Sequence, residues 1–134
     1  MARILVIEDN PANARFAGFV LTKAGHEVLH AADARSGIAL ATQQRPDLVL
    51  MDIQLPGMDG LEATRRLKAD PATRAIRVIA LTAFAMKGDE DRVRAAGCDG
   101  YLTKPFEHRQ LVEAVQAALA PAPESGNRPD GGDP

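Results

Sequence analysis

The chain has 134 residues, of which 46% are hydrophobic and 25% are charged, and its formal net charge is -2. This length favours one domain, the hydrophobic content excludes a disordered chain, and the charge balance gives no basic surface for nucleic acid. No apolar run is long enough to span a membrane, and the first residues do not have the pattern of a secretory leader. The single cysteine, Cys98, excludes an intrachain disulfide and suits a reducing compartment, so we expect a cytoplasmic protein.

Short apolar runs alternate with helical patterns along the chain. Asn10 followed by Pro11 is typical of a helix start, and Gly25 and Gly97 can end helices. The predicted strands are Arg3–Ile7, Val28–Ala31, Leu48–Asp52, Arg77–Leu81 and Gly100–Thr103. The predicted helices start at Pro11 with the stripe Phe16, Val20 and Ala24, start after Asp33 with Ala34, Ile38 and Ala41, span Leu61–Lys68 and Asp89–Ala96, and carry Leu111, Val112, Val115 and Leu119.

This alternation predicts an α/β fold, a single-domain (βα)5 arrangement with a doubly wound parallel sheet covered by helices on both faces. The crossovers between parallel strands are expected to be right-handed. We assign residues 1–120 to this domain. Residues 121–134 are rich in Pro, Gly and charged residues and have no apolar periodicity. We interpret them as a disordered tail; an ordinary terminus or the beginning of a linker fits the same composition.

The run Leu48–Asp52 is the strongest strand signal. Four apolar residues lead without a break into Asp52, which is typical of a strand buried on both faces. Turn residues follow at positions 55–60, so the chain leaves the sheet just beyond the aspartate. A lone aspartate at a strand end is usually a turn or cap residue, but open α/β sheets also bind their ligands at these ends.

Polar side chains stand at the ends of four predicted strands. Glu8 and Asp9 follow the first, Asp52 ends the third, Thr82 follows the fourth and Lys104 follows the fifth. Each has an ordinary interpretation alone: a charge at a helix start, a packing β-former or a solvated lysine. Because the carboxyl ends of parallel strands face one edge of a sheet, we expect all five side chains to converge there. Their joint occurrence is more specific than any single member.

Three close carboxylates repel one another, which favours protonation or a bound cation. Oxygen ligands suit Mg²⁺, which takes one or two carboxylates together with phosphate oxygens. A carboxylate can also attack phosphorus and form an aspartyl-phosphate. Lys104 and Thr82 supply a cation and a hydroxyl for phosphoryl oxygens. The residues therefore predict metal-assisted phosphoryl transfer, and leave open which carboxylate is attacked.

Four motifs in the same order together resemble the receiver domain of two-component response regulators: Glu8-Asp9-Asn10, Met51-Asp52 with residues 55–60, Leu81-Thr82-Ala83 and Lys104-Pro105. The resemblance covers residues 2–120. Residues 82–89 and 51–54 look most like stand-alone DivK-type cell-cycle receivers or the receivers of hybrid histidine kinases. For the fold, the resemblance implies the flavodoxin-like strand order 2-1-3-4-5, of which a receiver is a known example.

For the function, the resemblance implies a signalling switch of a two-component phosphorelay rather than a conventional enzyme, although such a domain catalyses its own phosphorylation and dephosphorylation. The donor would be a sensor histidine kinase or a histidine phosphotransferase, and the output a protein contact. The implied residue roles are Asp52 as phosphoacceptor, Asp9, Asp52 and the Gln54 carbonyl as Mg²⁺ ligands, Glu8 as a ligand through water, Thr82 and Lys104 as phosphoryl contacts, Tyr101 as the switch aromatic, and Lys104-Pro105 as a cis peptide.

Two other functions compete with the switch. A hydrolase of the aspartyl-phosphate class usually carries a second acid two residues after the nucleophile, where this chain has Gln54. A flavodoxin-like flavin protein needs a phosphate-binding loop after the first strand, where Glu8 and Asp9 would repel a phosphate. A purified flavin protein would be yellow, and a hydrolase would release phosphate catalytically.

Other conspicuous side chains receive structural interpretations. The histidines do not have the spacing of metal ligands and are expected at the surface. Cys98 is expected to be a small buried residue. Arg65 and Arg66 are expected on a solvated helix face. Phe84, in the loop after Thr82, could line the site or a partner surface. Three further phenylalanines are expected in or near the core: Phe16, Phe19 and Phe106.

Overall fold

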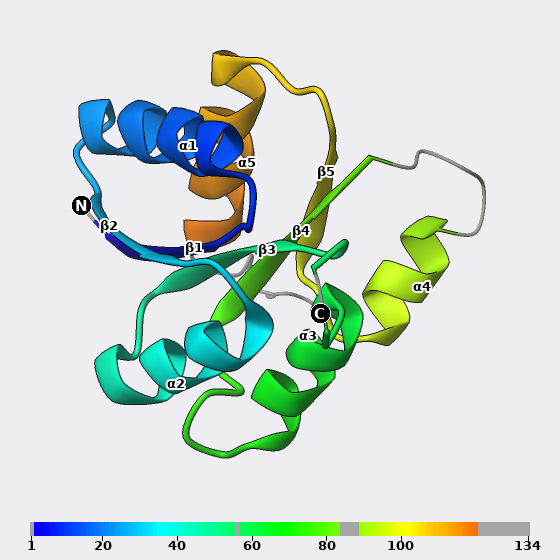
Figure 1. Cartoon of the computed structure of the whole chain (residues 1–134). Coiled ribbons are helices and arrows are strands. Elements are labelled where there is room, and N and C mark those ends of the chain that lie inside the picture. Colours follow the sequence, from blue (N-terminus) through cyan, green and yellow to red (C-terminus); the bar gives the residue numbers. More distant parts are fainter. Residues whose placement is uncertain (1, 56, 84–88, 121–134) are drawn as a thin grey trace, which may run out of the picture.

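The computed structural model describes residues 2–55, 57–83 and 89–120. Strands and helices alternate throughout these ranges (Figure 1). Phe84 and the predicted tail lie outside them. The elements are β1 (Arg3–Ile7), α1 (Pro11–Lys23), β2 (Glu27–Ala31), α2 (Ala34–Gln44), β3 (Leu48–Asp52), α3 (Gly60–Ala69), β4 (Arg77–Thr82), α4 (Asp89–Ala95), β5 (Gly100–Thr103) and α5 (His108–Leu119).

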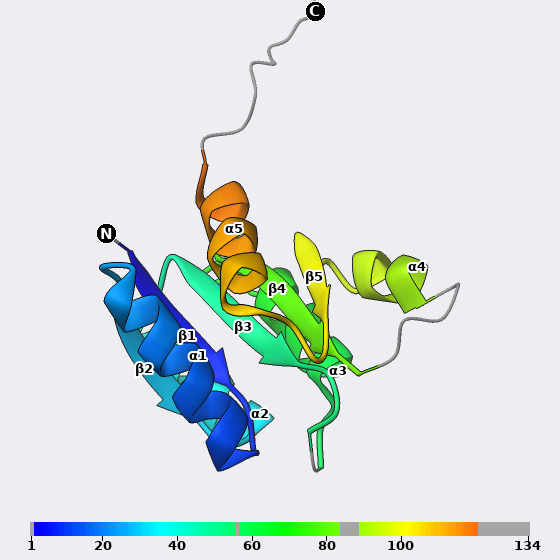
Figure 2. The ribbon, with the colours of Figure 1, turned by 90° about the horizontal axis from the view of Figure 1, so that it is seen from above.

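The strands form one sheet in the order β2-β1-β3-β4-β5, and every neighbouring pair is parallel. The expected α/β fold and strand order are confirmed. Ile7 of β1 pairs with Met51 of β3, and Asp52 of β3 pairs with Leu81 of β4. The carboxyl ends of the central strands therefore meet at one edge of the sheet, toward which the arrows point in Figure 2.

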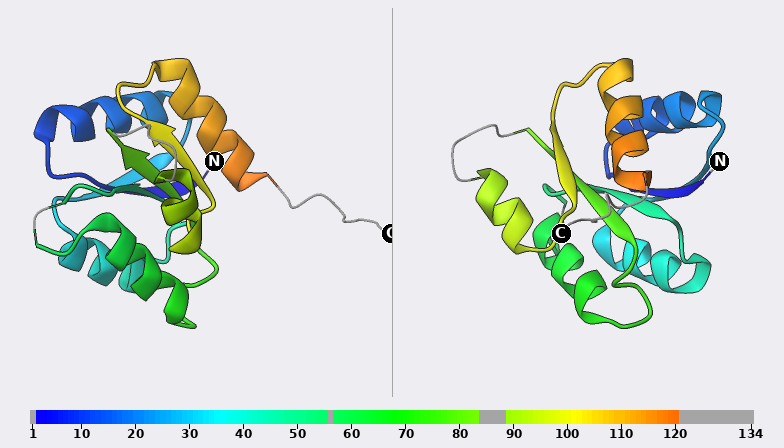
Figure 3. Two further views of the ribbon diagram at one scale, coloured as in Figure 1. Left: turned by 90° about the vertical axis from the view of Figure 1, so that its right-hand side faces the viewer. Right: turned by 180° about the vertical axis from the view of Figure 1, so that it is seen from behind.

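Helices cover both faces of the sheet, with α1 and α5 on one side and α2, α3 and α4 on the other (Figures 1 and 3). Alternate residues of β1 serve the two sides: Ile4 and Val6 pack in the cluster of α1 and α5, and Leu5 and Ile7 in the cluster of the other three helices. All five residues of β3 are buried, because helices cover it on both faces. This burial explains its unbroken apolar run.

The helix boundaries follow from side-chain caps. The Asn10 side chain accepts hydrogen bonds from the first amides of α1, and Asp33 and Asp59 cap α2 and α3 in the same way. Since Asp59 is the cap, α3 begins at Gly60, one residue before the predicted start. Gly97 follows α4 with φ of 105°, a backbone conformation that glycine adopts without steric cost.

The placement of two phenylalanines in the core was wrong. Phe16 is 41% exposed and Phe19 is 63% exposed. The buried face of α1 instead carries Ala17, Val20 and Leu21, which follow the i, i+3, i+4 spacing of a helix stripe. Both phenylalanines lie outside this buried stripe.

Three further side chains and one aromatic ring lie where the sequence predicts them. Cys98 is buried, and the side chains of Arg65 and Arg66 are exposed and paired with Glu62. Phe106 is partly buried against the cluster of α1 and α5. Within the described ranges, no helix is both long enough and apolar enough to cross a bilayer.

Candidate functional site

Three carboxylates gather at the carboxyl edge of the sheet. Glu8 and Asp9 follow β1, and Asp52 ends the neighbouring strand β3. One carboxylate oxygen of each lies within 4.8 Å of the other two. Glu8 and Asp52 are each 2% exposed, whereas Asp9 is exposed. The expected convergence of the acids is therefore present, with two members buried and one facing solvent.

Lys104 joins the two buried carboxylates. Its Nζ lies 3.0 Å from Glu8 Oε1 and 3.3 Å from Asp52 Oδ2. The residue follows β5, and its own amide donates to the carbonyl oxygen of Thr82 at 2.6 Å, which ties the end of β5 to β4. The peptide between Lys104 and Pro105 is cis. This ion pair brings together Lys104 and Glu8, which are 96 positions apart in sequence.

The electrostatics of the cluster favour a cation. Burial and the adjacent Asp52 raise the pKa of Glu8 above its ordinary value, against the opposing effect of Lys104. Burial alone would lower the pKa of Lys104, but its contacts with Glu8 and Asp52 outweigh that effect and raise it. When ionised, three carboxylates and one ammonium leave two negative charges uncompensated (3 - 1 = 2). An all-oxygen donor set with this charge fits Mg²⁺.

The connection from β3 to α3 packs tightly against Asp52. The amide of Gln54 donates to Asp52 Oδ1 at 2.9 Å. The amide of Gly60 donates to the carbonyl oxygen of Ile53 at 3.2 Å. A Cβ atom at Gly60 would collide with the Asp52 carbonyl oxygen and lie 2.6 Å from Ile53 Cα. Position 60 therefore requires glycine, a demand that the Asp-Gly turn signal did not reveal.

Thr82 lies at the edge of the sheet that carries the acids, whereas Tyr101 is directed toward α4. Thr82 is fully buried at the end of β4, at the same edge as the acids, and pairs in register with Thr103. Tyr101 pairs with Ala80, and its hydroxyl donates to Glu90 Oε1 on α4 at 3.4 Å. The tyrosine is thus directed toward α4 and is not part of the acid cluster.

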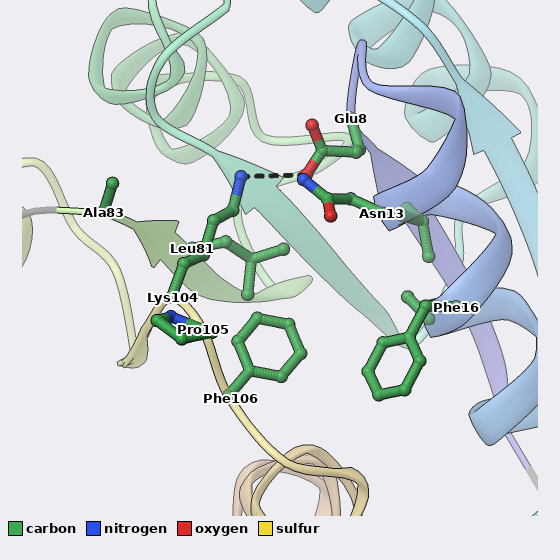
Figure 4. A pocket seen from close by; sticks show the side chains of 10 residues that line it. Glu8, Asn13, Phe16, Leu81, Ala83, Lys104, Pro105 and Phe106 are labelled. Carbon is green, nitrogen blue, oxygen red and sulfur yellow. Dashed lines mark hydrogen bonds and ion pairs between the residues drawn. The ribbon is translucent and has the colours of Figure 1, made fainter.

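A cavity of about 390 Å³ opens beside the Glu8–Lys104 pair. Its walls are mainly apolar, and Figure 4 shows Phe16 of α1 and Phe106 facing each other across it. The two ring centroids are 6.2 Å apart at an interplanar angle of 49°. The cavity was not predicted from the sequence, because both rings were expected in or near the core.

Two histidines also have contacts that the sequence did not indicate. The amide of Ala2 donates to His26 Nδ1 at 3.1 Å, and His30 Nε2 lies 3.0 Å from the carbonyl oxygen of Glu8. Both contacts are to backbone groups distant in sequence, so residue spacing could not predict them.

Residues 4–116 match the family described as Response regulator receiver domain. The chain belongs to this family. This receiver domain is 42% identical over 119 residues to the polar-differentiation response regulator DivK of Brucella anthropi, a match that covers 89% of this chain and 97% of the relative. The predicted resemblance is therefore confirmed. Receiver domains are signalling proteins of two-component systems and not conventional enzymes.

Solved structures of other receivers agree with this fold. The receiver domain of a sensor histidine kinase from Pseudomonas aeruginosa, with a magnesium ion coordinated in its active-site cleft, superposes with a TM-score of 0.82 at 38% identity, over 88% of this chain and 97% of that one. Chemotaxis protein CheY4 of Vibrio cholerae superposes with a TM-score of 0.84 at 28% identity, over 89% and 99%. The acid cluster therefore lies in a fold that matches solved receivers over 88% and 89% of this chain.

Proposed function

We propose that this receiver accepts a phosphoryl group on Asp52 from a phosphohistidine donor. The position of Asp52 carries the proposal. It ends the central strand, between Glu8 and Asp9 from β1 on one side and Thr82 from β4 on the other, and Lys104 contacts its Oδ2. The carboxylates, hydroxyl and ammonium that the structure describes at this edge therefore surround Asp52, and the match of the receiver motif to this residue supports it as the phosphoacceptor.

In the proposed reaction, a carboxylate oxygen of Asp52 attacks the phosphorus atom of the donor. An O–P bond forms while the P–N bond to the donor imidazole breaks, and the bonding electron pair returns to the ring nitrogen. Thr82 contributes a hydroxyl and Lys104 an ammonium to the phosphoryl oxygens, on which charge develops during transfer. The same carboxyl group releases phosphate when water attacks the aspartyl-phosphate.

Mg²⁺ is the proposed cofactor. Asp9 and Asp52 would bind it through their carboxylates, the Gln54 backbone through its carbonyl and Glu8 through water. When bound, the ion neutralises negative charge on the cluster and on the phosphoryl group. The two uncompensated charges support this assignment. The magnesium ion in the Pseudomonas aeruginosa receiver, 38% identical to this chain, also supports it.

The proposed partner for phosphorylation is a sensor histidine kinase or a histidine phosphotransferase. Exposed apolar side chains that lie together on a surface are typical of protein contacts. Of the chain's four phenylalanines, Phe16 and Phe19 are exposed on α1 and Phe106 borders the cavity beside Lys104. A partner docked there would bring its phosphohistidine to Asp52. We place this exchange in the cytoplasm.

This partner surface has its own test. Phe16→Ala should slow phosphotransfer from a phosphorylated donor protein while leaving labelling by a small phosphodonor unchanged. The donor is identified by profiling the chain against the histidine kinases and phosphotransferases of the source organism. Equal transfer rates for Phe16→Ala and wild type would place the docking surface elsewhere.

The decisive test of the phosphoacceptor is intact-mass analysis after incubation with acetyl phosphate and Mg²⁺. Wild type should gain one phosphoryl group, and Asp52→Asn should gain none. Asp47→Asn is the matched control, because Asp47 directly precedes the same strand at its opposite end. Equal labelling of wild type and Asp52→Asn would overturn the assignment.

A further inference from the structure

His30 connects the end of β2 to the backbone of the acid cluster. Its Nε2 lies 3.0 Å from the carbonyl oxygen of Glu8, although the residues are 22 positions apart. Because a carbonyl oxygen can only accept, Nε2 carries the hydrogen and donates it. The amide of Glu8 also reaches β2, since it donates to the carbonyl oxygen of Ala31 at 3.0 Å. Both backbone polar groups of Glu8 are thus bonded to β2.

The His30 imidazole adds one hydrogen bond to the β1–β2 ladder, beyond the last backbone pair of the two strands. The register between β1 and β2 ends with the pair Ile7 and Ala31. Beyond Ala31 the chain bends toward α2, whose N-cap is Asp33. The donor for the Glu8 carbonyl therefore comes from a side chain, the ring of His30, and not from a further strand amide.

The position of the Asp9 carboxylate depends on the backbone more than the positions of the Glu8 and Asp52 carboxylates do. The carboxylates of Glu8 and Asp52 are each fixed by Lys104 and by a backbone amide. The Asp9 carboxylate, in contrast, has no hydrogen bond or ion pair with any residue that the structure describes. Its position within the cluster is therefore set by the peptides on either side of it.

Both of those peptides are anchored. The peptide before Asp9 contains the Glu8 carbonyl, to which His30 donates. The amide after it, that of Asn10, donates to Glu8 Oε2 at 3.1 Å. We infer that His30 is a positioning residue for the proposed Mg²⁺ site, because its hydrogen bond to the Glu8 carbonyl holds the Asp9 carboxylate close to those of Glu8 and Asp52. This inference rests on the proposed function.

The test is a Mg²⁺ titration followed by the backbone amide NMR shifts of residues 8–10 and 52–54. His30→Ala should raise the Mg²⁺ dissociation constant by about tenfold, the lower end of the range for residues that orient metal ligands. His30→Gln should stay close to wild type, because its amide group can donate to the same carbonyl. His30 is exposed, so neither variant removes a core side chain.

His26→Ala is the matched control. His26 precedes β2 at its other end and also contacts a backbone group, the amide of Ala2, so its loss reports general destabilisation without touching the cluster. It should leave the dissociation constant unchanged. Equal Mg²⁺ affinities for wild type and His30→Ala, or a His30→Gln variant as weak as His30→Ala, would overturn the inference. A wild-type chain without a saturable Mg²⁺ response would instead refute the proposed metal site.

Discussion

Replacing Lys104 with methionine tests how much the cluster depends on its one ammonium. Lys104 contacts Glu8 at 3.0 Å and Asp52 at 3.3 Å, and the acid side chains are only 2% and 3% exposed. At an effective dielectric constant near 20, each contact has a Coulomb energy of about 5 kcal/mol before desolvation is subtracted. Removing one partner of a buried ion pair costs about 3–5 kcal/mol, because the remaining charge stays buried and unpaired. The lower end applies here, since the Lys104 side chain is 20% exposed.

A loss of about 3 kcal/mol corresponds to a fall of the melting midpoint by about 12 °C for a domain of this size. The assay is thermal and urea unfolding of Lys104→Met in a buffer with a chelator. Mg²⁺ should restore part of the loss, because it supplies positive charge to the same carboxylates. Lys23→Met is the control, because Lys23 lies over the exposed ring of Phe19 and away from the acids; it should change the midpoint little.

The loss should also depend on pH. Burial already raises the pKa of Glu8, and removing Lys104 raises it further. When the folded-state pKa of an acid lies above its unfolded-state value, the folded protein loses stability as pH rises through the folded-state pKa. Lys104→Met should therefore be less destabilised at about pH 5 than at about pH 8. A loss below about 1 kcal/mol that does not change with pH would refute this account of the ion pairs.

Three further predictions concern other parts of the chain. Asp9→Ala should weaken Mg²⁺ binding more than Glu8→Ala in a metal titration, and should slightly raise the metal-free midpoint because it relieves repulsion within the cluster; the reverse order of affinities would reverse the roles of the two acids. Burial lowers the pKa of His26, so its neutral form contributes stability above about pH 6.5 that is lost as pH falls below that value. The urea midpoint of His26→Gln should accordingly change less than that of wild type between about pH 7 and pH 5. Equal changes of the two midpoints with pH would show that His26 does not contribute to the pH dependence of stability. Deleting residues 121–134 should leave the midpoint nearly unchanged, whereas a fall of several degrees, about 1 kcal/mol, would mean that the tail docks on the domain.

The fold was predictable because the apolar runs, the helix caps and the polar strand ends all indicate the same arrangement. The unbroken apolar run Leu48–Met51 requires cover on both faces, and helices on both faces supply it. Asn10, Asp33 and Asp59 mark helix starts because their short side chains accept from the first helix amides. The acids were predictable as a group because parallel strands end at one edge. The strand order itself came from the family resemblance and not from the residues.

The remaining details depend on three-dimensional placement. A helix stripe can be shifted by one residue without changing its period, so the sequence did not reveal that Ala17 is buried while Phe16 is 41% exposed and lines the cavity. The contact of His30 with Glu8 depends on the register of β1 and β2. The collision that excludes a side chain at Gly60 depends on where α3 begins relative to β3. None of these is a local property of the sequence.

The most direct test of Asp52 as the phosphoacceptor is a crystal structure of the chain grown with Mg²⁺ and beryllofluoride, a phosphoryl mimic. The mimic is expected on a carboxylate oxygen of Asp52, with Thr82 and Lys104 in contact with its fluorine atoms. The ion is expected to bind the Asp9 and Asp52 carboxylates and the Gln54 carbonyl. A mimic attached to Glu8 or Asp9, or an ion bound away from the three carboxylates, would contradict these assignments.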